Sequence, residues 1–305
     1  MKDRINLHMF LAPIQSETRL YKETTYTLQE GLFSRVVVCG LWEVGLSRKE
    51  VNSWGLEIYR KKTLINFYKK VAFLRKAIAL SKICAGVSLI QYCLFVLWKA
   101  AVLRPTHVSC HNVALLPLSW LAARLFGAHL IYVPHELETE RAHLEGKAKI
   151  IQSWVEQKFI RFTREIVVVC DPIAQWYREN YTLDNVSTVR NVPKQADTAR
   201  SDWSKNILRD TFKIPDSALI VIYQGVLGPA RGTARLLETF AALDGERFHL
   251  VLMGFGDATV LNTVDIAVEQ NSNIHYQPAV PMSEIISYTA SADVAIFVTN
   301  EGALS

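Results

Sequence analysis

Two apolar runs in the second half of the chain end in glycine and lead directly into a helical pattern. The first is Tyr223–Gly232, which carries Arg231 where the helix is expected to start, and the second is Leu250–Asp257. A strand, a glycine turn and a helix N-terminus together bring backbone N–H groups close to a phosphate. Parallel α/β sheets bind their ligands at such turns, on the carboxyl ends of the strands. The pattern therefore predicts either a phosphate site or two ordinary turns of a doubly wound sheet.

Strand-like runs alternate with helical patterns along nearly the whole chain, which favours a parallel sheet covered on both faces. The polar stretch Asn191–Ser201 interrupts this alternation and is typical of a linker. We therefore expect an α/β fold with two Rossmann-like domains, residues 1–192 and 200–305. The second domain has fewer strands than the usual five or so, and we expect it to be incomplete. The expected strands are Ile5–Leu11, Arg35–Leu41, His107–His111, Leu130–Pro134, Glu165–Cys170, Leu219–Tyr223, Phe248–Met253, Ile274–Gln277 and Val294–Val298.

Charge is distributed unevenly along the chain, although the net charge is only +5. No Asp or Glu occurs between Ile58 and His135, whereas many lysines and arginines do. Within this region, apolar residues recur at helical spacing between the basic residues of 60–82. The pattern predicts a helix that lies on an anionic membrane surface, or a core helix whose lysines extend to solvent. We expect residues 60–82 to contact anionic lipid peripherally, at the inner face of the membrane.

The longest uncharged run, Ile83–Trp98, is shorter than the roughly 18 to 20 residues that span a bilayer. We therefore expect it not to cross a membrane. The five cysteines are odd in number and show no metal-binding spacing, which favours buried thiols in a reduced compartment. The N-terminus lacks a signal-peptide pattern. These features predict a cytoplasmic protein without a metal site, and nothing in the sequence predicts nucleic-acid binding.

A series of short motifs in a fixed order resembles the retaining glycosyltransferases of family 4. No single motif is specific, but their order and spacing cover almost the whole chain. The matching segments are His111-Asn112, Pro134–Leu137, Glu165–Cys170, Val189–Pro193, Gly225–Gly232, Leu250–Gly256 and Ala292–Ala295.

The resemblance implies two Rossmann-like domains of the GT-B architecture and a nucleotide-diphosphate sugar as donor, with no metal ion or other cofactor. In the first domain it places His135, with His111 and the positioning residue Glu136, at the reaction centre. In the second domain it implies that Arg231 contacts the donor diphosphate, as an arginine fork suits two phosphate oxygens. The remaining donor-side residues that it implies are Gly225, Gly232, Gly254, Gly256, Val280 and Glu301.

The chain also departs from the family pattern. Val226 stands where the family has a second arginine after the first glycine, and the partner of Glu301 in the family's glutamate pair would lie beyond Ser305. The leading expectation is a glycosyltransferase that acts with retention on a saccharide or lipid-linked acceptor, in cell-surface polysaccharide or glycoconjugate synthesis. The alternative is a truncated, non-catalytic remnant or partner subunit. An NAD enzyme is disfavoured because no G-x-G-x-x-G follows the first strand.

Some candidate residues have an ordinary structural interpretation as well. His111 can be a hydrogen-bonded histidine at a strand end, and Asp257 can cap the helix that follows it. Glu138 is a second carboxyl group near His135. The other histidines lack a setting at a strand's carboxyl end, and we expect them on the surface: His107, His129, His143, His249 and His275.

Overall fold

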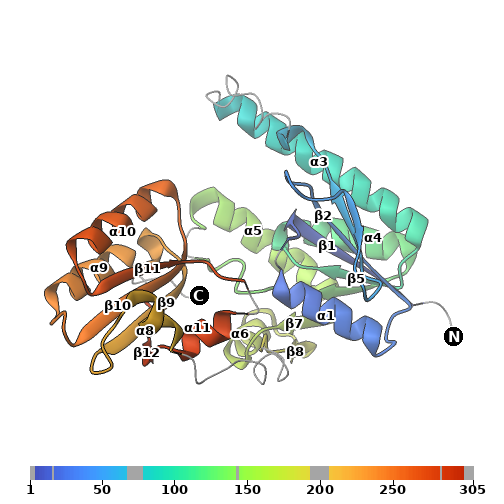
Figure 1. Ribbon diagram of the computed structural model, residues 1–305. Coiled ribbons are helices and arrows are strands. Elements are labelled where there is room, and N and C mark those ends of the chain that lie inside the picture. The colour runs from blue at the N-terminus through green and yellow to red at the C-terminus, as the bar shows by residue number, and fades with distance from the viewer. Residues whose placement is uncertain are drawn as a thin grey trace. The chain divides into compact units, whose positions relative to one another are not determined.

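The computed structural model describes residues 4–15, 17–66, 78–141, 144–192, 206–281 and 284–298. These residues form two compact units, which meet in the sequence between Asn191 and Val192 (Figure 1). Each unit consists of a mainly parallel sheet with helices on its faces. Unit 1 is the N-terminal one and unit 2 the C-terminal one.

The sheet of unit 1 has eight strands within the described residues, in the order β3-β4-β2-β1-β5-β6-β7-β8. Every pairing is parallel except β3 with β4. Because consecutive parallel strands need crossovers, helices cover the sheet. The strands are β1 (Ile5–Pro13), β2 (Arg35–Leu41), β3 (Lys49–Val51), β4 (Glu57–Lys61), β5 (His107–Cys110), β6 (His129–Tyr132), β7 (Glu165–Val168) and β8 (Val186–Thr188).

Two apolar clusters lie on opposite faces of this sheet. Alternate residues of β2 separate them: Val36 and Val38 pack with α1, whereas Val37 and Cys39 pack with α3 and α4. This alternation is the two-residue period of a strand that is buried on both faces. The helices of unit 1 are α1 (Thr18–Gln29), α3 (Ile78–Leu103), α4 (Leu116–Phe126), α5 (Gly146–Phe159) and α6 (Asp171–Tyr181), with short 3-10 turns at η2 (Val113–Leu115) and η3 (Ile160–Phe162).

Unit 2 has a parallel sheet in the order β11-β10-β9-β12 within the described residues. One face packs on α9 and α10, and the other on α8 and α11. Asp257 accepts a hydrogen bond from the backbone N–H of Val260 at 2.9 Å, so its predicted role as a helix cap is confirmed. The elements are α8 (Ile207–Phe212), β9 (Leu219–Val226), η4 (Pro229–Arg231), α9 (Thr233–Ala242), β10 (Phe248–Phe255), α10 (Ala258–Gln270), β11 (Ile274–Pro278), α11 (Ile285–Ala290) and β12 (Val294–Ala295).

The predicted α/β fold with Rossmann-like parallel sheets is confirmed, with differences in detail. The sequence analysis missed β3, β4 and β8, and β12 is shorter than expected. Parts of the predicted linker and of the basic region 60–82 lie outside the described residues. All five cysteines are described and free; Cys39, Cys84 and Cys110 are buried, whereas Cys93 and Cys170 are half-buried.

The uncharged run Ile83–Trp98 is part of a longer helix. Helix α3 continues through Lys99 to Leu103, and its segment Lys82–Leu103 is long and apolar enough to cross a membrane by length and composition alone, with a mean hydropathy of 1.7. In the structure, however, one face of α3 belongs to the core of unit 1. Tyr92, Val96 and Ala100 are fully buried there.

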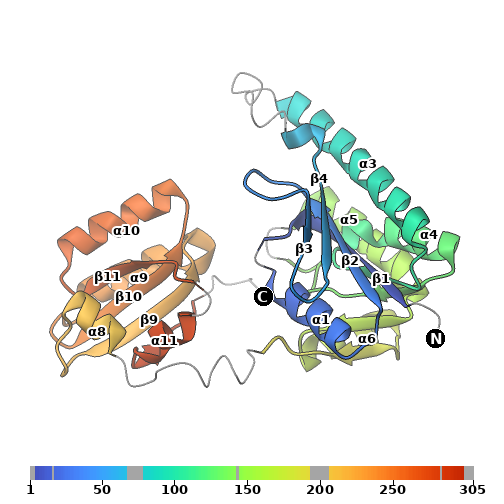
Figure 2. The ribbon, with the colours of Figure 1, turned by 45° about the vertical axis from the view of Figure 1, so that its right-hand side comes forward.

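The Tyr92 side chain fixes α3 to the sheet. Its hydroxyl accepts a hydrogen bond from the Phe10 N–H (3.2 Å) and lies 2.9 Å from the Cys39 carbonyl, to which it donates. It thus connects the helix to both β1 and β2. Figure 2 shows α3 lying along the sheet, with its amino-terminal end projecting past the strands.

Candidate functional site

Three histidines from neighbouring strands form a continuous chain in unit 1. His8 lies in β1, and His111 and His135 follow β5 and β6. The His8 Nδ1 lies 2.9 Å from His111 Nε2, and His111 Nδ1 lies 3.2 Å from His135 Nε2. Phe10 packs against the rings of both His111 and His135. The parallel register β1-β5-β6 produces this row, because each strand carries its histidine to the same edge of the sheet.

Burial keeps all three rings neutral at neutral pH. It lowers the pKa of His8 to about 3 and that of His111 well below its usual value. The pKa of His135 falls to about 4, mainly through burial and further through the positive charges of Arg19 and Arg141. A neutral imidazole carries one N–H donor and one acceptor nitrogen. Each histidine of the row can therefore accept one hydrogen bond and donate another, and the row carries no charge.

The inner end of the chain decides the direction of these hydrogen bonds. His8 Nε2 is buried and has no hydrogen-bond partner among the described residues. A buried N–H without an acceptor is less favourable than a buried acceptor without a donor. The proton of His8 therefore belongs on Nδ1, from where it is donated to His111. His111 in turn donates to His135, and His135 is left with an Nδ1–H donor at the half-buried end of the chain.

Arg19 supplies a fixed positive charge beside this chain. It lies in α1, is 9 % exposed, and donates hydrogen bonds to the carbonyls of Pro134 (3.4 Å) and Val167 (3.3 Å). One turn further along α1, the half-buried Glu23 has its pKa raised to about 7, because desolvation outweighs the attraction of Arg19. The sequence analysis missed both His8 and Arg19. Only their position in the sequence pointed to them: His8 lies on the first strand, and Arg19 lies on the helix directly after it.

The carboxylates near His135 bind an arginine rather than the histidines. Glu136 forms an ion pair with Arg141 at 2.7 Å, and Glu138 also pairs with Arg141. Glu138 is buried and accepts a hydrogen bond from the Val113 N–H at 3.2 Å, which ties the segment after β6 to the one after β5. No hydrogen bond joins Glu136 to the histidine chain among the described residues.

A buried carboxylate, that of Glu156, fixes the loop after β6 through hydrogen bonds. Glu156 in α5 is fully buried and accepts hydrogen bonds from the hydroxyls of Tyr132 (2.8 Å), Tyr177 (2.9 Å) and Tyr181 (2.7 Å). Thr139 of the loop after β6 donates a fourth, at 3.3 Å. Burial raises the pKa of Glu156, while these four donors oppose the shift. The arrangement holds the loop that carries His135 against α5 and α6.

In unit 2, two predicted glycines face each other where β9 and β10 end. Gly225 (φ +141°) pairs with Gly254 (φ +155°) in the parallel register. A Cβ atom on Gly254 would lie 1.8 Å from the Gly225 carbonyl oxygen, so no other residue fits. The strands thus present bare backbone around a small cavity of about 120 Å³, which Val280 also lines, together with Gln224, Phe255 and Ile285.

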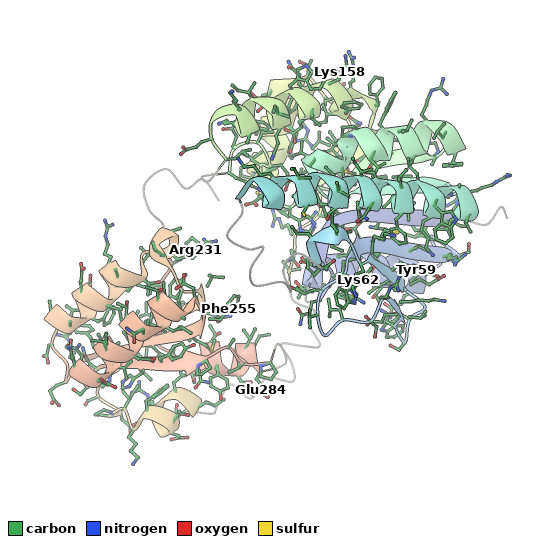
Figure 3. All side chains as sticks on the ribbon, turned by 90° about the horizontal axis from the view of Figure 1, so that it is seen from above. Tyr59, Lys62, Lys158, Arg231, Phe255 and Glu284 are labelled. Atoms are coloured by element: carbon green, nitrogen blue, oxygen red, sulfur yellow. The ribbon has the colours of Figure 1, made fainter. Side chains whose placement is uncertain are left out.

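The turn after β9 carries Arg231 to the start of α9. Gly228 donates its N–H to the Thr233 hydroxyl at 2.9 Å, which closes the turn around η4. Arg231 is half-buried, with its guanidinium 5.8 Å from the centre of the Phe297 ring. Gly232 begins α9, and Gly256 packs against the Leu227 carbonyl oxygen. Arg231 and Phe255 are labelled on unit 2 in Figure 3.

The structure thus groups the predicted residues in two places. His111 and His135 meet in unit 1, whereas Gly225, Gly254 and Val280 surround one cavity in unit 2. Arg231 does not line that cavity but lies at the next turn. Glu301 falls outside the described residues. Among the residues that the structure describes, no group of three or more His, Cys, Asp or Glu side chains is placed to hold a metal ion.

The expectation that the other histidines lie on the surface is wrong for His249. It is 7 % exposed, and its Nδ1 lies 2.9 Å from His275 Nε2 in a stacked pair. The parallel register of β10 with β11 places both rings on one face, where Phe212 stacks on His275. His107 is half-buried against Phe33. His143 lies outside the described residues.

Sequence comparison finds no matching family model and no matching curated protein. Solved structures do match the fold. Sucrose-phosphate synthase from Thermosynechococcus elongatus aligns with a TM-score of 0.69 at 11% identity, over 96% of this chain and 74% of that one. Anabaena HepE in complex with UDP and glucose aligns with a TM-score of 0.61 at 10% identity, over 96% and 74% of the two chains. WaaG, a glycosyltransferase involved in lipopolysaccharide biosynthesis, gives 0.61 at 11% identity, over 96% and 75%.

We expect the His8→Phe variant to lose part of the acid sensitivity of the protein. A pKa of about 3 in the folded state means that His8 stays neutral while the unfolded chain binds a proton below about pH 6.5. Stability is therefore lost as the pH falls, by about 2 kcal/mol for this group at pH 5. The loss between pH 7 and pH 5, measured by urea unfolding, should shrink by that amount in the variant.

Glu23 acts with the opposite sign, because its raised pKa favours the folded state as the pH falls, but it is present in both proteins and cancels. The matched control is His129→Phe, since His129 is exposed. An unchanged pH dependence in His8→Phe would contradict the assigned protonation state.

The Gly254→Ala substitution should destabilise unit 2 by about 3 kcal/mol or more, since the new methyl group would force β9 and β10 apart. Gly245→Ala is the matched control, because its nearest contact would be an ordinary 3.6 Å from Asn273. Thermal unfolding followed by circular dichroism distinguishes them, and equal melting temperatures would refute the close approach.

The geometry and the solved structures agree on the architecture. Both units have Rossmann-like parallel sheets, and the fold is the GT-B fold of glycosyltransferases.

Proposed function

We propose that this protein is a glycosyltransferase that moves a sugar from a nucleotide-diphosphate sugar to a saccharide or lipid-linked acceptor, with retention of configuration, as in family 4. The observation that carries the proposal is the end of the unit 2 sheet, where paired glycines expose backbone beside a turn that holds Arg231. Fold likeness to solved glycosyltransferases, one of them in complex with UDP and glucose, supports it as an analogy.

The donor is bound by unit 2 in this proposal. The diphosphate lies at the amino end of α9, where the helix dipole and unpaired N–H groups favour negative charge. Arg231 contributes a guanidinium that can hold two phosphate oxygens. The cavity lined by Gly225, Gly254 and Val280 takes the nucleotide base, against Phe255. Charge neutralisation is thus assigned to the arginine and the helix rather than to a metal ion or another cofactor.

Unit 1 contributes the neutral histidine chain. The Nδ1–H of His135 donates a hydrogen bond to a hydroxyl of the transferred sugar or to an oxygen of the leaving phosphate, where charge develops in the transition state. His111 and His8 position this donor, because their hydrogen bonds fix its tautomer and its ring orientation. Glu136 acts only through Arg141, by holding the loop. Retention in family 4, which the sequence motifs resemble, requires no dedicated enzymatic base, so the proposal assigns none.

A second candidate function is a non-catalytic partner of such an enzyme. Val226, which takes the place of a second arginine in the family pattern, is 48 % exposed beside the turn. One cation at the diphosphate is therefore replaced by an apolar side chain. This candidate predicts nucleotide-sugar binding without transfer.

The acceptor and the location also belong to the proposal. We assign the enzyme to cell-surface polysaccharide or glycoconjugate synthesis at the cytoplasmic face of the membrane, with residues 60–82 in contact with anionic lipid. Much of that segment, residues 67–77, lies outside the described residues. The basic composition of the segment is what supports the contact.

The Arg231→Ala variant should bind UDP-glucose about 10- to 100-fold more weakly, as expected for the loss of a charged hydrogen bond to phosphate. Arg247→Ala is the control, because Arg247 is exposed and directly precedes β10, at the opposite end of the unit 2 sheet. Titration calorimetry with UDP-, GDP- and ADP-sugars gives both the affinity and the preferred nucleotide. Equal affinities in the two variants would show that the diphosphate is bound elsewhere.

Sugar transfer tests the reaction itself. We expect label from the preferred nucleotide sugar to enter membrane extracts, and His135→Ala to slow this transfer about 100- to 1,000-fold with little change in donor affinity. His129→Ala is the control. Transfer by His135→Ala at the rate of the unmodified protein would remove His135 from the mechanism. Donor binding without transfer by any protein would favour the non-catalytic partner.

A further inference from the structure

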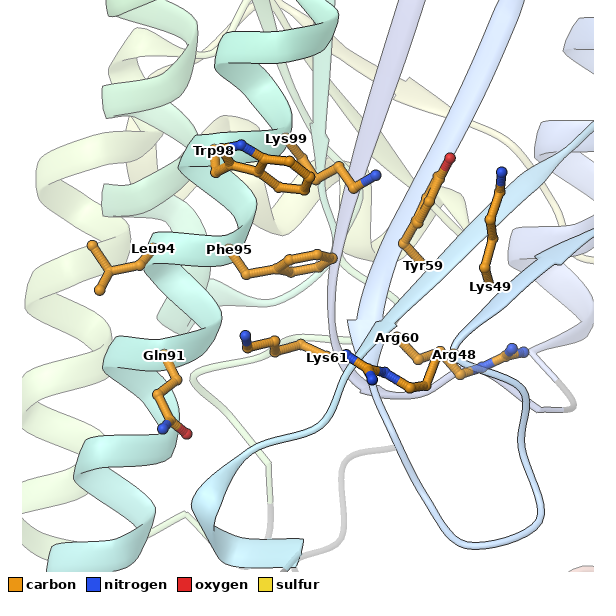
Figure 4. Close-up of a pocket in the computed structure, with 10 residues that line it drawn as sticks. All are labelled: Arg48, Lys49, Tyr59, Arg60, Lys61, Gln91, Leu94, Phe95, Trp98 and Lys99. Atoms are coloured by element: carbon orange, nitrogen blue, oxygen red, sulfur yellow. The ribbon is translucent and has the colours of Figure 1, made fainter.

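A cavity of about 730 Å³ lies between β4 and α3 on the flank of unit 1, separate from the histidine chain (Figure 4). Strand β4 contributes Tyr59 and Lys61, and α3 contributes Phe95, Trp98 and Lys99. The two elements are far apart in the sequence, and the sheet edge brings them together. Aromatic and basic side chains make up most of the cavity walls.

Most of the positive charges of this cavity have no ion-pair partner among the described residues; the exception is Arg60, which pairs with Glu50 at 2.9 Å. Lys49, Lys61, Lys99 and Arg48 line it, and none of them has a carboxylate within ion-pair distance among the described residues. Glu57, on the same strand as Tyr59 and Lys61, is bound by Arg35 and by the Tyr59 hydroxyl.

The lysines instead lie against aromatic rings. The Lys99 ammonium is 3.2 Å from the centre of the Tyr59 ring and 5.1 Å from that of Trp98, and Lys61 is 5.8 Å from that of Phe95. Lys99 is only 9 % exposed as a residue. Ring faces stabilise such cations but leave their charge uncompensated. The cluster is therefore suited to an anion with several oxygen atoms, such as a phosphate.

The outer wall of the cavity continues into an apolar surface along α3. Leu94 and Trp98 are 64 % and 58 % exposed, and further large apolar residues extend the same surface in both directions. Single exposed apolar side chains are ordinary, but a continuous stripe marks an interaction site. The stripe comprises Ile83, Val87, Ile90, Leu94, Trp98 and Val102.

We propose that this flank binds an anionic membrane lipid, with the headgroup phosphate in the cavity among Lys49, Lys61 and Lys99 and the acyl chains along the α3 stripe. An anionic phospholipid combines a phosphate group, which the lysines of the cavity attract, with acyl chains, which the apolar stripe can contact. The proposal rests on the membrane contact in the proposed function. It adds the cavity between β4 and α3 as a specific lipid site to the basic segment 60–82. It does not depend on the identity of the donor.

Helix α3 lies on the membrane rather than across it. A spanning position would require lipid on all sides of the helix, but Tyr92 is bonded to β1 and β2 and fully buried. Pulling that face out of the core would leave buried polar groups unpaired. The helix can therefore present only the stripe to lipid while it stays part of unit 1.

The test is co-sedimentation of the full chain with vesicles of phosphatidylcholine alone or with about 30% phosphatidylglycerol. We expect at least tenfold tighter binding to the anionic vesicles, weakened by salt. The double variant Lys49→Gln and Lys61→Gln should bind the anionic vesicles about 25-fold more weakly, from roughly fivefold per lysine near an anionic surface. The double variant Ile90→Gln and Leu94→Gln should weaken binding to both kinds of vesicle.

Matched controls lie elsewhere on the chain. Lys147→Gln with Lys158→Gln removes two exposed lysines of α5, and Lys158 also lies over an aromatic ring, that of Trp154. In Figure 3, α3 and α4 lie between Lys158 and Tyr59. Ile266→Gln removes an exposed apolar residue of unit 2. These variants should bind vesicles like the unmodified protein.

Several outcomes would overturn the proposal. Equal binding to neutral and anionic vesicles would refute the phosphate pocket. An equal loss of vesicle binding in the α5 lysine controls would show that the overall charge of the protein, and not this cavity, attracts the vesicles. Tight binding of free glycerol phosphate without vesicle binding would identify a soluble ligand. Self-association abolished by Leu94→Gln, without vesicle binding, would identify a second copy of the chain. Because no nucleotide sugar is used, these results are independent of whether transfer occurs.

Discussion

The parallel register of the strands is the constraint on which both candidate sites depend. In a parallel sheet each strand delivers the chain to the same edge, so residues that are far apart in sequence become neighbours. In unit 1 this register aligns His8, His111 and His135 within hydrogen-bond distance. In unit 2 it places Gly225 directly opposite Gly254. Neither grouping needs a specialised loop, because the hydrogen-bonded ladder itself sets the positions.

Burial then determines the chemistry that each group can perform. The histidine chain is neutral because desolvation outweighs any gain from protonation, and the nearby cation Arg19 shifts the balance further. The carboxylates of the same region behave differently, since each has a cation or several hydroxyl donors. Glu156 illustrates this point, as four hydroxyl groups bind it in the core. The histidines are thus hydrogen-bond donors and acceptors, whereas the acidic residues hold the loops.

The sequence predicted the alternating architecture because long apolar runs and glycine turns are local signals. It could not predict the edge strand β3 or its neighbour β4, which are short and carry charged residues such as Glu50 and Lys61. The uncharged run Ile83–Trp98 alone did not show how far α3 extends, because Lys99 interrupts the apolar residues. In the structure, the Lys99 ammonium rests on the Tyr59 ring, so the helix continues past it. His8 was missed because its position on the first strand points to a site only once its neighbours in other strands are known.

The two faces of α3 lie in different surroundings. A helix that is apolar on all sides is buried in a large protein or in a membrane. Here the face with Tyr92 and Val96 is buried in protein, and the opposite face with Ile90 and Leu94 is exposed. Burying only half of such a helix leaves apolar area that water does not favour. A neighbouring cluster of uncompensated lysines makes a generic protein partner a poor complement to this flank, whereas a layer with anionic headgroups above apolar chains satisfies both parts at once.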